Sequence, residues 1–301
     1  MDSSLVSSYF ENISLIIPAY NEEKAIEHTL DELSREECLQ SAEIIVIDDG
    51  SKDNTANIVA KFSKIRLIRH HTNMGYGSSI TTGVRAANRE WVIWFDSDGQ
   101  HRPEDLIALG SRLVSDGLDY CVGIRDSSSH EDQNRKFGKS ILRLIIHLLV
   151  GKPLKDFNSG LRGFRHDINR RLLPLLPARF GASTATSLLM LQGKYRGAEV
   201  PIVVRQRKGH SSVNQIRDGI LTLVIILRMI MIYKPLRLFV GLGSFLVLTG
   251  VVYGFIRAFS DGQGIPVLAS LIVIFGLQTL FFGLLSDQIN SLRYERFENT
   301  D

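Results

Sequence analysis

The stretch Trp91-Val92-Ile93-Trp94-Phe95-Asp96-Ser97-Asp98 decides the fold prediction. Its first five residues are apolar or aromatic, which is typical of a strand that is buried on both faces. Two acidic residues then follow one residue apart, and their like charges repel each other unless a cation lies between them. A divalent metal ion that holds a diphosphate is the simplest such cation, because Mg²⁺ is bound by one or two carboxylates together with phosphate oxygens.

Three further strands precede this stretch and alternate with helices. Continuous apolar runs predict strands at residues 13–17, 44–47 and 65–68, and the segments that follow them predict helices at 22–33, 55–62 and 77–87. This alternation predicts an α/β fold with a mostly parallel central sheet that is covered by helices on both faces. Ligands of such sheets bind at the carboxyl ends of the strands.

Polar segments follow the first, second and fourth of these strands. They are Pro18-Ala19-Tyr20-Asn21-Glu22, Asp48-Asp49-Gly50-Ser51 and Asp96-Ser97-Asp98. Because parallel strands end at one edge of the sheet, the three segments are expected to form one site. The alternative for the second segment is a plain Asp-Gly turn, with Asp53 as the cap of the helix that follows. For the third segment the alternative is a surface turn, which is compatible with metal binding.

The segment Gly75-Tyr76-Gly77-Ser78-Ser79-Ile80 begins like a dinucleotide-binding fingerprint. Its last position is not glycine, and it follows the third predicted strand, so the match gives little support to NAD binding. The glycines more simply allow a tight entry into a helix whose N-terminus faces the site.

Two long stretches of the chain, 238–256 and 262–286, carry no charged residue. Each is long enough to cross ~30 Å of hydrocarbon as a helix. Buried helices of a soluble core are the alternative, but such helices seldom run so long without a charge. We therefore predict two transmembrane helices within 236–286, with an amphipathic juxtamembrane helix at 213–235 and a cytoplasmic tail at 287–301.

The charges near the predicted spans indicate the topology. By the positive-inside rule both termini are expected to be cytoplasmic, on the evidence of Arg228, Lys234, Arg237, Arg293 and Arg296.

The whole chain has a nearly neutral balance, with 35 Lys and Arg residues and 32 Asp and Glu residues. This balance does not indicate binding to bulk nucleic acid. Cys38 and Cys121 form no CxxC pair, so zinc and redox motifs are not indicated, and no signal peptide is recognised at the N-terminus.

Taken together, the motifs resemble those of the polyprenyl-phosphate glycosyltransferases of glycosyltransferase family 2. The resemblance covers about residues 12–290 and is carried by PAYNE (18–22), IDDGSKDNT (47–55), FDSDGQHRPEDL (95–106), DFNSGLRGFR (156–165) and VPIVVRQRKGHSS (200–212), followed by the two apolar helices. It implies a GT-A nucleotide-sugar-binding catalytic domain over residues 1–212. It also implies an inverting, metal-dependent transfer of a sugar from a nucleotide diphosphate sugar to a polyprenyl phosphate.

The resemblance also implies roles for single residues. Asp96 and Asp98 would hold Mg²⁺ or Mn²⁺ with Gln100 as a third ligand, and Asp98 and Asp156 are the catalytic candidates. The alternative for Asp156 is a helix or turn cap. The nucleotide sugar, a UDP-sugar rather than GDP-mannose, would contact Pro18, Ala19, Tyr20, Glu22, Asp49, Asp96 and Ser97.

An anionic lipid acceptor requires cations at the membrane-facing side. The candidates for acceptor-phosphate binding are Arg125, Arg135, Lys136, Ser140, Arg205, Arg207 and Lys208. Arginine suits bidentate phosphate contacts, and lysine acts as a point charge. A basic face that meets anionic lipid headgroups is the alternative.

The segment Gly181-Ala182-Ser183-Thr184-Ala185-Thr186 contains no acid, although the resemblance places a catalytic base there in relatives with hydroxyl acceptors. A phosphate acceptor is already anionic near neutral pH and needs no dedicated base, so this departure favours it. Two alternatives stay open: a membrane glycosyltransferase with a hydroxyl acceptor, which would build a glycolipid or polysaccharide, and a non-catalytic membrane subunit that binds nucleotide sugar.

A homo-oligomer is a further expectation, because small residues let membrane helices approach closely. The small residues in the predicted spans are Gly241, Gly243, Gly250 and Gly254.

Overall fold

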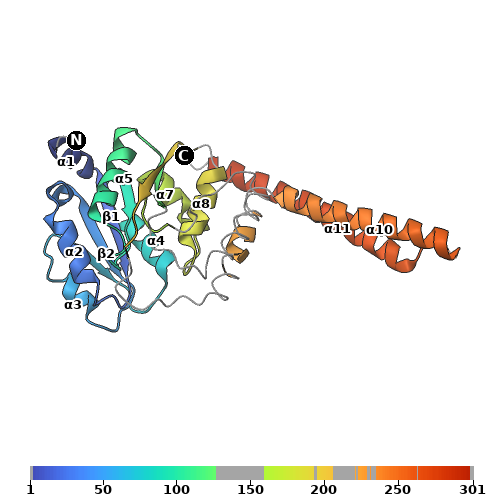
Figure 1. Ribbon diagram of the computed structural model, residues 1–301, viewed down its shortest axis with the longest axis horizontal. Coiled ribbons are helices and arrows are strands. Elements are labelled where there is room, and N and C mark those ends of the chain that lie inside the picture. Colours follow the sequence, from blue (N-terminus) through green and yellow to red (C-terminus); the bar gives the residue numbers. More distant parts are fainter. Residues whose placement is uncertain are drawn as a thin grey trace. The chain divides into compact units, whose positions relative to one another are not determined.

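A computed structural model describes residues 3–126, 159–192, 195–205, 221, 223–228, 231, 235–262 and 264–298 (Figure 1). The chain forms two compact units, and among the described residues the first extends to Ile225 and the second begins at Ile226. Asp156 and the acceptor candidates Arg135, Lys136, Ser140, Arg207 and Lys208 lie outside the described residues.

The first unit is built around a mixed sheet. Its described strands are β1 Ile13–Ala19, β2 Glu43–Asp48, β3 Arg66–Arg69, β4 Trp91–Trp94, β5 Tyr120–Arg125, β6 Arg162–Arg165 and β7 Gly197–Ile202. They lie in the order β3-β2-β1-β4-β6-β5-β7. Strand β6 is antiparallel to both of its neighbours, and the other pairings are parallel. The predicted α/β class and mostly parallel sheet are therefore confirmed.

The central strands are buried, as their apolar runs predicted. Every residue of β1 and of β4 is buried. Strand β1 runs on past its predicted end, since Pro18 pairs with Ile47 and Ala19 with Asp48. A proline removes only one N–H donor from the ladder, and the carbonyl of Ala19 still accepts a hydrogen bond from the amide of Asp49.

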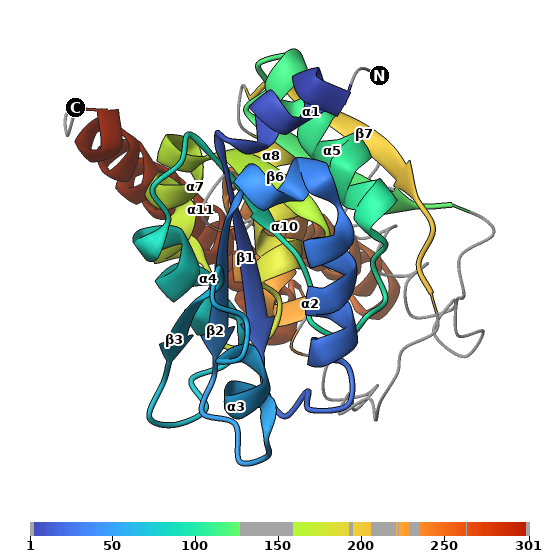
Figure 2. The ribbon, with the colours of Figure 1, turned by 90° about the vertical axis from the view of Figure 1, so that its left-hand side faces the viewer.

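Helices cover both faces of the sheet (Figure 2). The described α-helices of the first unit are α1 Ser3–Phe10, α2 Ile26–Arg35, α3 Thr55–Val59, α4 Tyr76–Ala86, α5 Pro103–Ser115, α7 His166–Leu172 and α8 Ala182–Gln192, with short 3₁₀ turns at Glu37–Ser41 and Leu173–Leu175. Helices α2 and α5 share one hydrophobic core with Leu15 and Ile17 of β1. Helix α4 packs on the opposite face, where a Cβ on Gly83 would lie 2.3 Å from Ile16.

The second unit contains two long apolar helices, α10 Pro235–Asp261 and α11 Val267–Glu298. Their candidate spans, Pro235–Ser260 and Val267–Leu292, have mean hydropathies of 2.0 and 2.3, and only 17% of each apolar window is buried. Helices of a soluble core would be mostly buried, so these surfaces fit a hydrocarbon environment. Helix α11 continues beyond residue 286, which makes much of the predicted tail helical. In the predicted juxtamembrane segment, residues 221, 223–228 and 231 are helical and the others lie outside the described residues.

Glycines bring the two helices of the hairpin together. A Cβ on Gly243 would lie 2.9 Å from the carbonyl of Gly276, and a Cβ on Gly250 would lie 3.0 Å from the carbonyl of Ala269. A Cβ on Gly241 would meet no atom within 4 Å. Gly243 and Gly250 thus allow close packing between the two helices of one chain, and the homo-oligomer stays a prediction.

Candidate active site

Several chain segments meet at the carboxyl edge of the sheet. Strand β1 lies between β2 and β4, so the segments after these three strands are neighbours. Because β6 runs in the opposite direction, β5 and β7 again end at this edge, where Arg125 and Arg205 lie. Residues Ser159 and Gly160 precede β6 at the same edge. The site therefore lies at the switch point of strand order, between β1 and β4.

The loops after β1 and β2 are joined by hydrogen bonds. The amide of Asn21, at a φ of 54°, donates to Ser51 Oγ over 2.9 Å. Asn21 Oδ1 accepts from the amide of Lys52 over 2.9 Å, and the amide of Glu22 donates to Thr55 Oγ1 over 2.9 Å. These contacts fix the wall at which the donor is predicted to bind. Tyr20 is 40% exposed on it.

Asp53 supports the same wall from the second loop. Its carboxylate accepts from the amide of Glu23 over 3.1 Å and from the amide and hydroxyl of Thr55 over 3.0 and 2.5 Å. Burial raises the pKa of this carboxyl, but the hydrogen bonds from Thr55 and Glu23 outweigh it and hold the pKa below its ordinary value of 3.8. Asp53 thus holds the first residue of α3, in keeping with the capping alternative.

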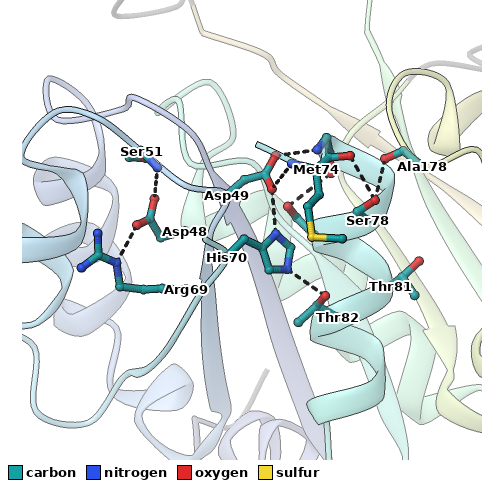
Figure 3. Close-up of polar contacts among 12 residues, drawn as sticks. Asp48, Asp49, Ser51, Arg69, His70, Met74, Ser78, Thr81, Thr82 and Ala178 are labelled. Atoms are coloured by element: carbon teal, nitrogen blue, oxygen red, sulfur yellow. Dashed lines mark hydrogen bonds and ion pairs between the residues drawn. The ribbon is translucent and has the colours of Figure 1, made fainter. Parts of the chain in front are cut away.

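Asp48 and Asp49 are occupied by partners within the chain (Figure 3). Asp48 accepts from the amide of Ser51 and from Nε of Arg69, each over 3.0 Å, and its side chain is fully buried. The Asp49 carboxylate is 4% exposed and accepts from the amides of Met74 and Gly75 over 2.9 and 2.7 Å. It also lies 2.7 Å from Nδ1 of His70. A contact of Asp49 with the base or ribose of the donor stays a prediction.

The first turn of α4 borders the site, but carbonyl groups of the protein occupy its amides. Gly77 N donates to the carbonyl of Arg179 over 3.1 Å, and Ser78 N donates to the carbonyl of Ala178 over 2.7 Å. A Cβ on Gly77 would lie 1.9 Å from the carbonyl of Pro177. The glycine at this position therefore allows a close approach of the protein backbone, and these two amides are not available to a phosphate.

Asp96 keeps part of its carboxylate exposed. Its side chain is 29% exposed, Oδ1 accepts from the Tyr76 hydroxyl over 3.2 Å, and Oδ2 lies 3.6 Å from Nε2 of His101. Burial raises the pKa of this carboxyl, but the nearby His101, the Tyr76 hydroxyl and the Arg162 charge outweigh it, so the pKa lies below its ordinary value. Asp96 therefore carries a negative charge at neutral pH.

Ser97, Asp98 and Gln100 have more enclosed positions. Ser97 is 4% exposed, and its hydroxyl donates to the carbonyl of Pro18 over 2.8 Å, which ties the end of β4 to that of β1. Asp98 is 7% exposed and accepts from the amide of Gln100 over 3.1 Å. The Gln100 side chain donates to the carbonyl of Arg205 over 3.2 Å. Gln100 thus links the metal-binding candidates to the segment after β7.

The segment that opens β6 packs directly against Asp96. A Cβ on Gly160 would lie 1.9 Å from Asp96 Oδ2, so any larger residue there would displace the Asp96 carboxylate. Arg162 is fully buried, with its guanidinium 5.8 Å from the centre of the Trp94 ring. It donates to the carbonyl of Ser183 and to the hydroxyls of Thr186 and Ser187. The polar residues of α8 therefore hold a buried cation that lies close enough to influence Asp96.

The donor set at the end of β4 fits a metal ion that is shared with a substrate. The described residues contain no group of three or more His, Cys, Asp or Glu side chains that could hold a metal ion. Mg²⁺ often binds only one or two carboxylates and completes its shell with substrate phosphates and water. Asp96 is ionised and partly exposed, with Asp98 two residues further on, so the pair matches that mode of binding.

Comparison with known proteins agrees with this architecture. Residues 14–173, more than half of the chain, match the family model described as Glycosyl transferase family 2. The chain belongs to glycosyl transferase family 2. Residues 234–292 match a second model, described as the GtrB C-terminal hairpin. The two apolar helices and this match identify a membrane-anchored protein.

Relatives of this family 2 glycosyltransferase include enzymes named for lipid phosphates. The UDP-N-acetylglucosamine–dolichyl-phosphate N-acetylglucosaminyltransferase of Methanococcus voltae is 33% identical over 214 residues, which cover 63% of this chain and 84% of that protein. The undecaprenyl-phosphate 4-deoxy-4-formamido-L-arabinose transferase of Proteus mirabilis is 27% identical over 307 residues, which cover 95% and 91%.

Solved structures confirm the fold of the glycosyltransferase domain. The glucosyl-3-phosphoglycerate synthase of Mycobacterium tuberculosis, in complex with Mn²⁺, UDP-glucose and phosphoglyceric acid, superposes with a TM-score of 0.60 at 20% identity. The match covers 76% of this chain and 84% of that one. This likeness shows the GT-A fold that the sequence predicted.

Arg125 and Arg205 are the acceptor candidates of this glycosyltransferase among the described residues, and both lie at the edge of the site. Arg205 Nη1 lies 2.8 and 3.0 Å from the two carboxylate oxygens of Glu32 on α2. Its amide donates to the carbonyl of Gln100. Arg125 is partly buried at the end of β5. The structure thus gives Arg205 an acidic partner, and phosphate binding by either arginine stays a prediction.

Four residues around Asp96 are not among the sequence-based candidates: Tyr76, His101, Gly160 and Arg162. His101, Gly160 and Arg162 lie inside the motifs that carry the family resemblance, and that membership is the signal by which they could have been found. Tyr76 lies in the glycine-rich segment 75–80, whose glycines predict a tight entry into a helix that faces the site. Nothing in its sequence spacing indicates that its hydroxyl reaches Asp96.

Proposed function

We propose that this chain transfers a sugar from a nucleotide diphosphate sugar to a polyprenyl phosphate, with inversion, at the cytoplasmic face of a membrane. The observation that carries the proposal is the union, in one chain, of a family 2 glycosyltransferase domain and a hairpin of membrane length. Such an anchor keeps the site close to a lipid acceptor. The names of the relatives with dolichyl and undecaprenyl phosphates support the same acceptor class.

On the donor side, a UDP-sugar would lie at the edge formed by β1, β2 and β4. Its contacts would come from Pro18, Ala19, Tyr20, Glu22, Asp49, Asp96 and Ser97. Mg²⁺ or Mn²⁺ held by Asp96 and Asp98, with Gln100 beside them, would supply positive charge against the leaving nucleoside diphosphate. The UDP preference is supported by the name of the Methanococcus voltae relative.

On the acceptor side, the chemistry of α8 supports a phosphate. The first turn of α8 has no acidic residue, and hydroxyls of its first two turns accept hydrogen bonds from the buried Arg162. A lipid phosphate needs no base, so an acid is not required there. Arg125 and Arg205 would attract the phosphate, together with the basic candidates outside the described residues, and Asp156 would orient it. Both termini would be cytoplasmic.

The acceptor test uses the full-length protein in detergent with Mn²⁺ and a panel of labelled UDP- and GDP-sugars. Polyprenyl phosphate is supplied in one arm and diacylglycerol in the other. We expect label in a lipid product only with polyprenyl phosphate, and release of that label by mild acid. Transfer to diacylglycerol alone would establish the hydroxyl-acceptor alternative instead. Donor binding without transfer or hydrolysis in any arm would indicate a non-catalytic subunit.

A further inference from the structure

His70 lies in an enclosed position between two polar partners. Its side chain is 8% exposed, with Nδ1 2.7 Å from Asp49 Oδ1 and Nε2 2.9 Å from Thr82 Oγ1. An ionised carboxylate can only accept hydrogen bonds, so Nδ1 carries a proton and donates to Asp49. In the neutral ring Nε2 then accepts from the Thr82 hydroxyl. The three side chains form one directed chain of hydrogen bonds (Figure 3).

Asp49 connects this series of hydrogen bonds to the turn that precedes α4. Its carboxylate accepts from the amides of Met74 and Gly75 over 2.9 and 2.7 Å. Gly75 has a φ of 99°, and a Cβ there would lie 2.7 Å from the Cα of Arg179. The turn therefore cannot be held by a side chain at Gly75, and the carboxylate of Asp49 fixes it through the backbone.

The turn leads directly to the metal-binding candidate. Tyr76 is the next residue and the first of α4, and its hydroxyl donates to Asp96 Oδ1 over 3.2 Å. The path from His70 to Asp96 thus runs through one carboxylate, two amides and one hydroxyl. None of its steps requires a contact of His70 with the metal or the donor.

We propose that His70 is a positioning residue. Its hydrogen bond orients the Asp49 carboxylate toward the turn before α4, and this turn keeps the Tyr76 hydroxyl in contact with Asp96. This rests on the proposed function, because it takes Asp96 as a metal ligand. Groups that orient metal ligands typically change metal affinity by about 10- to 100-fold when they are removed. A histidine that only packed the domain would change its stability and leave metal affinity unchanged.

Two substitutions at His70 separate its two hydrogen bonds. Asparagine places an amide N–H close to the position of Nδ1, whereas glutamine places one close to the position of Nε2. His70→Asn therefore keeps a donor for Asp49, and His70→Gln loses it. Thr81→Val is the matched control, since the Thr81 hydroxyl donates to the carbonyl of Gly77 within α4 and lies outside the chain of bonds.

The experiment measures Mn²⁺ binding to the full-length protein in detergent with saturating UDP, from the electron paramagnetic resonance signal of free Mn²⁺. Thermal unfolding of each variant is recorded beside it. We expect His70→Gln to weaken Mn²⁺ binding about tenfold. His70→Asn should stay within about twofold of the wild type, because its donor to Asp49 is kept, and Thr81→Val should bind as the wild type does.

A double variant tests whether the effect passes through Tyr76. Tyr76→Phe alone should weaken Mn²⁺ binding about tenfold, and its combination with His70→Gln should add little, because both act on one path. Equal binding by His70→Gln and wild type, or fully additive losses, would overturn the positioning role. If the wild type itself binds no Mn²⁺ with UDP, the metal assignment in the proposed function fails instead.

Discussion

Two acidic pairs follow buried strands at the same edge of the sheet, yet the structure uses them differently. At the end of β2, Asp48 is fully buried and the Asp49 side chain is 4% exposed. At the end of β4, Asp98 is 7% exposed, whereas the Asp96 side chain is 29% exposed. The first pair accepts short hydrogen bonds from amides and side chains of neighbouring loops. Asp96 accepts a longer hydrogen bond from Tyr76, and His101 lies 3.6 Å away.

The difference shows what converts an acidic pair into a ligand-binding pair. A carboxylate that accepts several hydrogen bonds from the chain has fewer lone pairs left for a cation. One that is ionised, partly exposed and only loosely held has lone pairs left for a cation. Substitution of Asp96 or Asp98 is therefore expected to affect activity most, and substitution of the fully buried Asp48 is expected to affect stability most.

The largest effect should follow neutralisation of the β4 pair. Asp96→Asn and Asp98→Asn each remove negative charge at the metal-binding candidates while keeping the side-chain shape. We expect sugar transfer to fall by about 10³-fold or more, with thermal unfolding close to that of the wild type. The measurement is the transfer rate with polyprenyl phosphate and Mn²⁺. Full activity in Asp98→Asn would refute the assignment of the metal.

A change beside Asp96 should lower activity without removing any charge. Gly160→Ala places a Cβ where the Asp96 carboxylate lies, so that carboxylate must move. A misplacement of about 1 Å typically costs about 10²-fold in rate. Gly241→Ala is the matched control, since a Cβ there meets nothing within 4 Å. Equal transfer rates in the two variants would show that the position of Asp96 does not matter.

Substitution of Asp48, the fully buried member of the β2 pair, should mainly affect folding. Asp48→Ala leaves the amide of Ser51 without its acceptor and frees Arg69 to solvent. We expect a loss of about 1–3 kcal/mol in unfolding free energy, the usual cost of an unsatisfied buried group. Chemical denaturation of the wild type and the variant gives this number. A variant that unfolds like the wild type but no longer transfers sugar would place Asp48 in the ligand site.

The smallest effect concerns Asp53, a further carboxylate that holds a loop. Its pKa is lowered in the folded protein, so its contribution to stability is complete above the ordinary value of 3.8 and is lost as the pH falls through the lower folded value. The melting temperature should therefore drop below about pH 4, and less steeply in Asp53→Asn. Parallel pH profiles for the two proteins would show that Asp53 makes no such contribution.

Much of the fold could be predicted because the central strands are continuous apolar runs that end in polar segments. Strands β5, β6 and β7 were not predicted, and in β6 the residue Arg162 within Arg-Gly-Phe-Arg does not resemble part of a buried strand. Its charge is accommodated by the carbonyl and hydroxyl groups of α8, which only the tertiary structure brings near. The sequence likewise shows both acidic pairs but not their donors, because the amides that hold Asp49 lie 25 and 26 residues away.

The most direct test of the difference between the two pairs is anomalous scattering from crystals of the protein with Mn²⁺ and UDP. The account predicts one strong manganese peak at bonding distance from a carboxylate oxygen of Asp96 or Asp98, shared with the diphosphate. It also predicts no peak at Asp48 or Asp49. A manganese peak on the β2 pair, or a diphosphate bound at this edge without metal at Asp96 and Asp98, would contradict it.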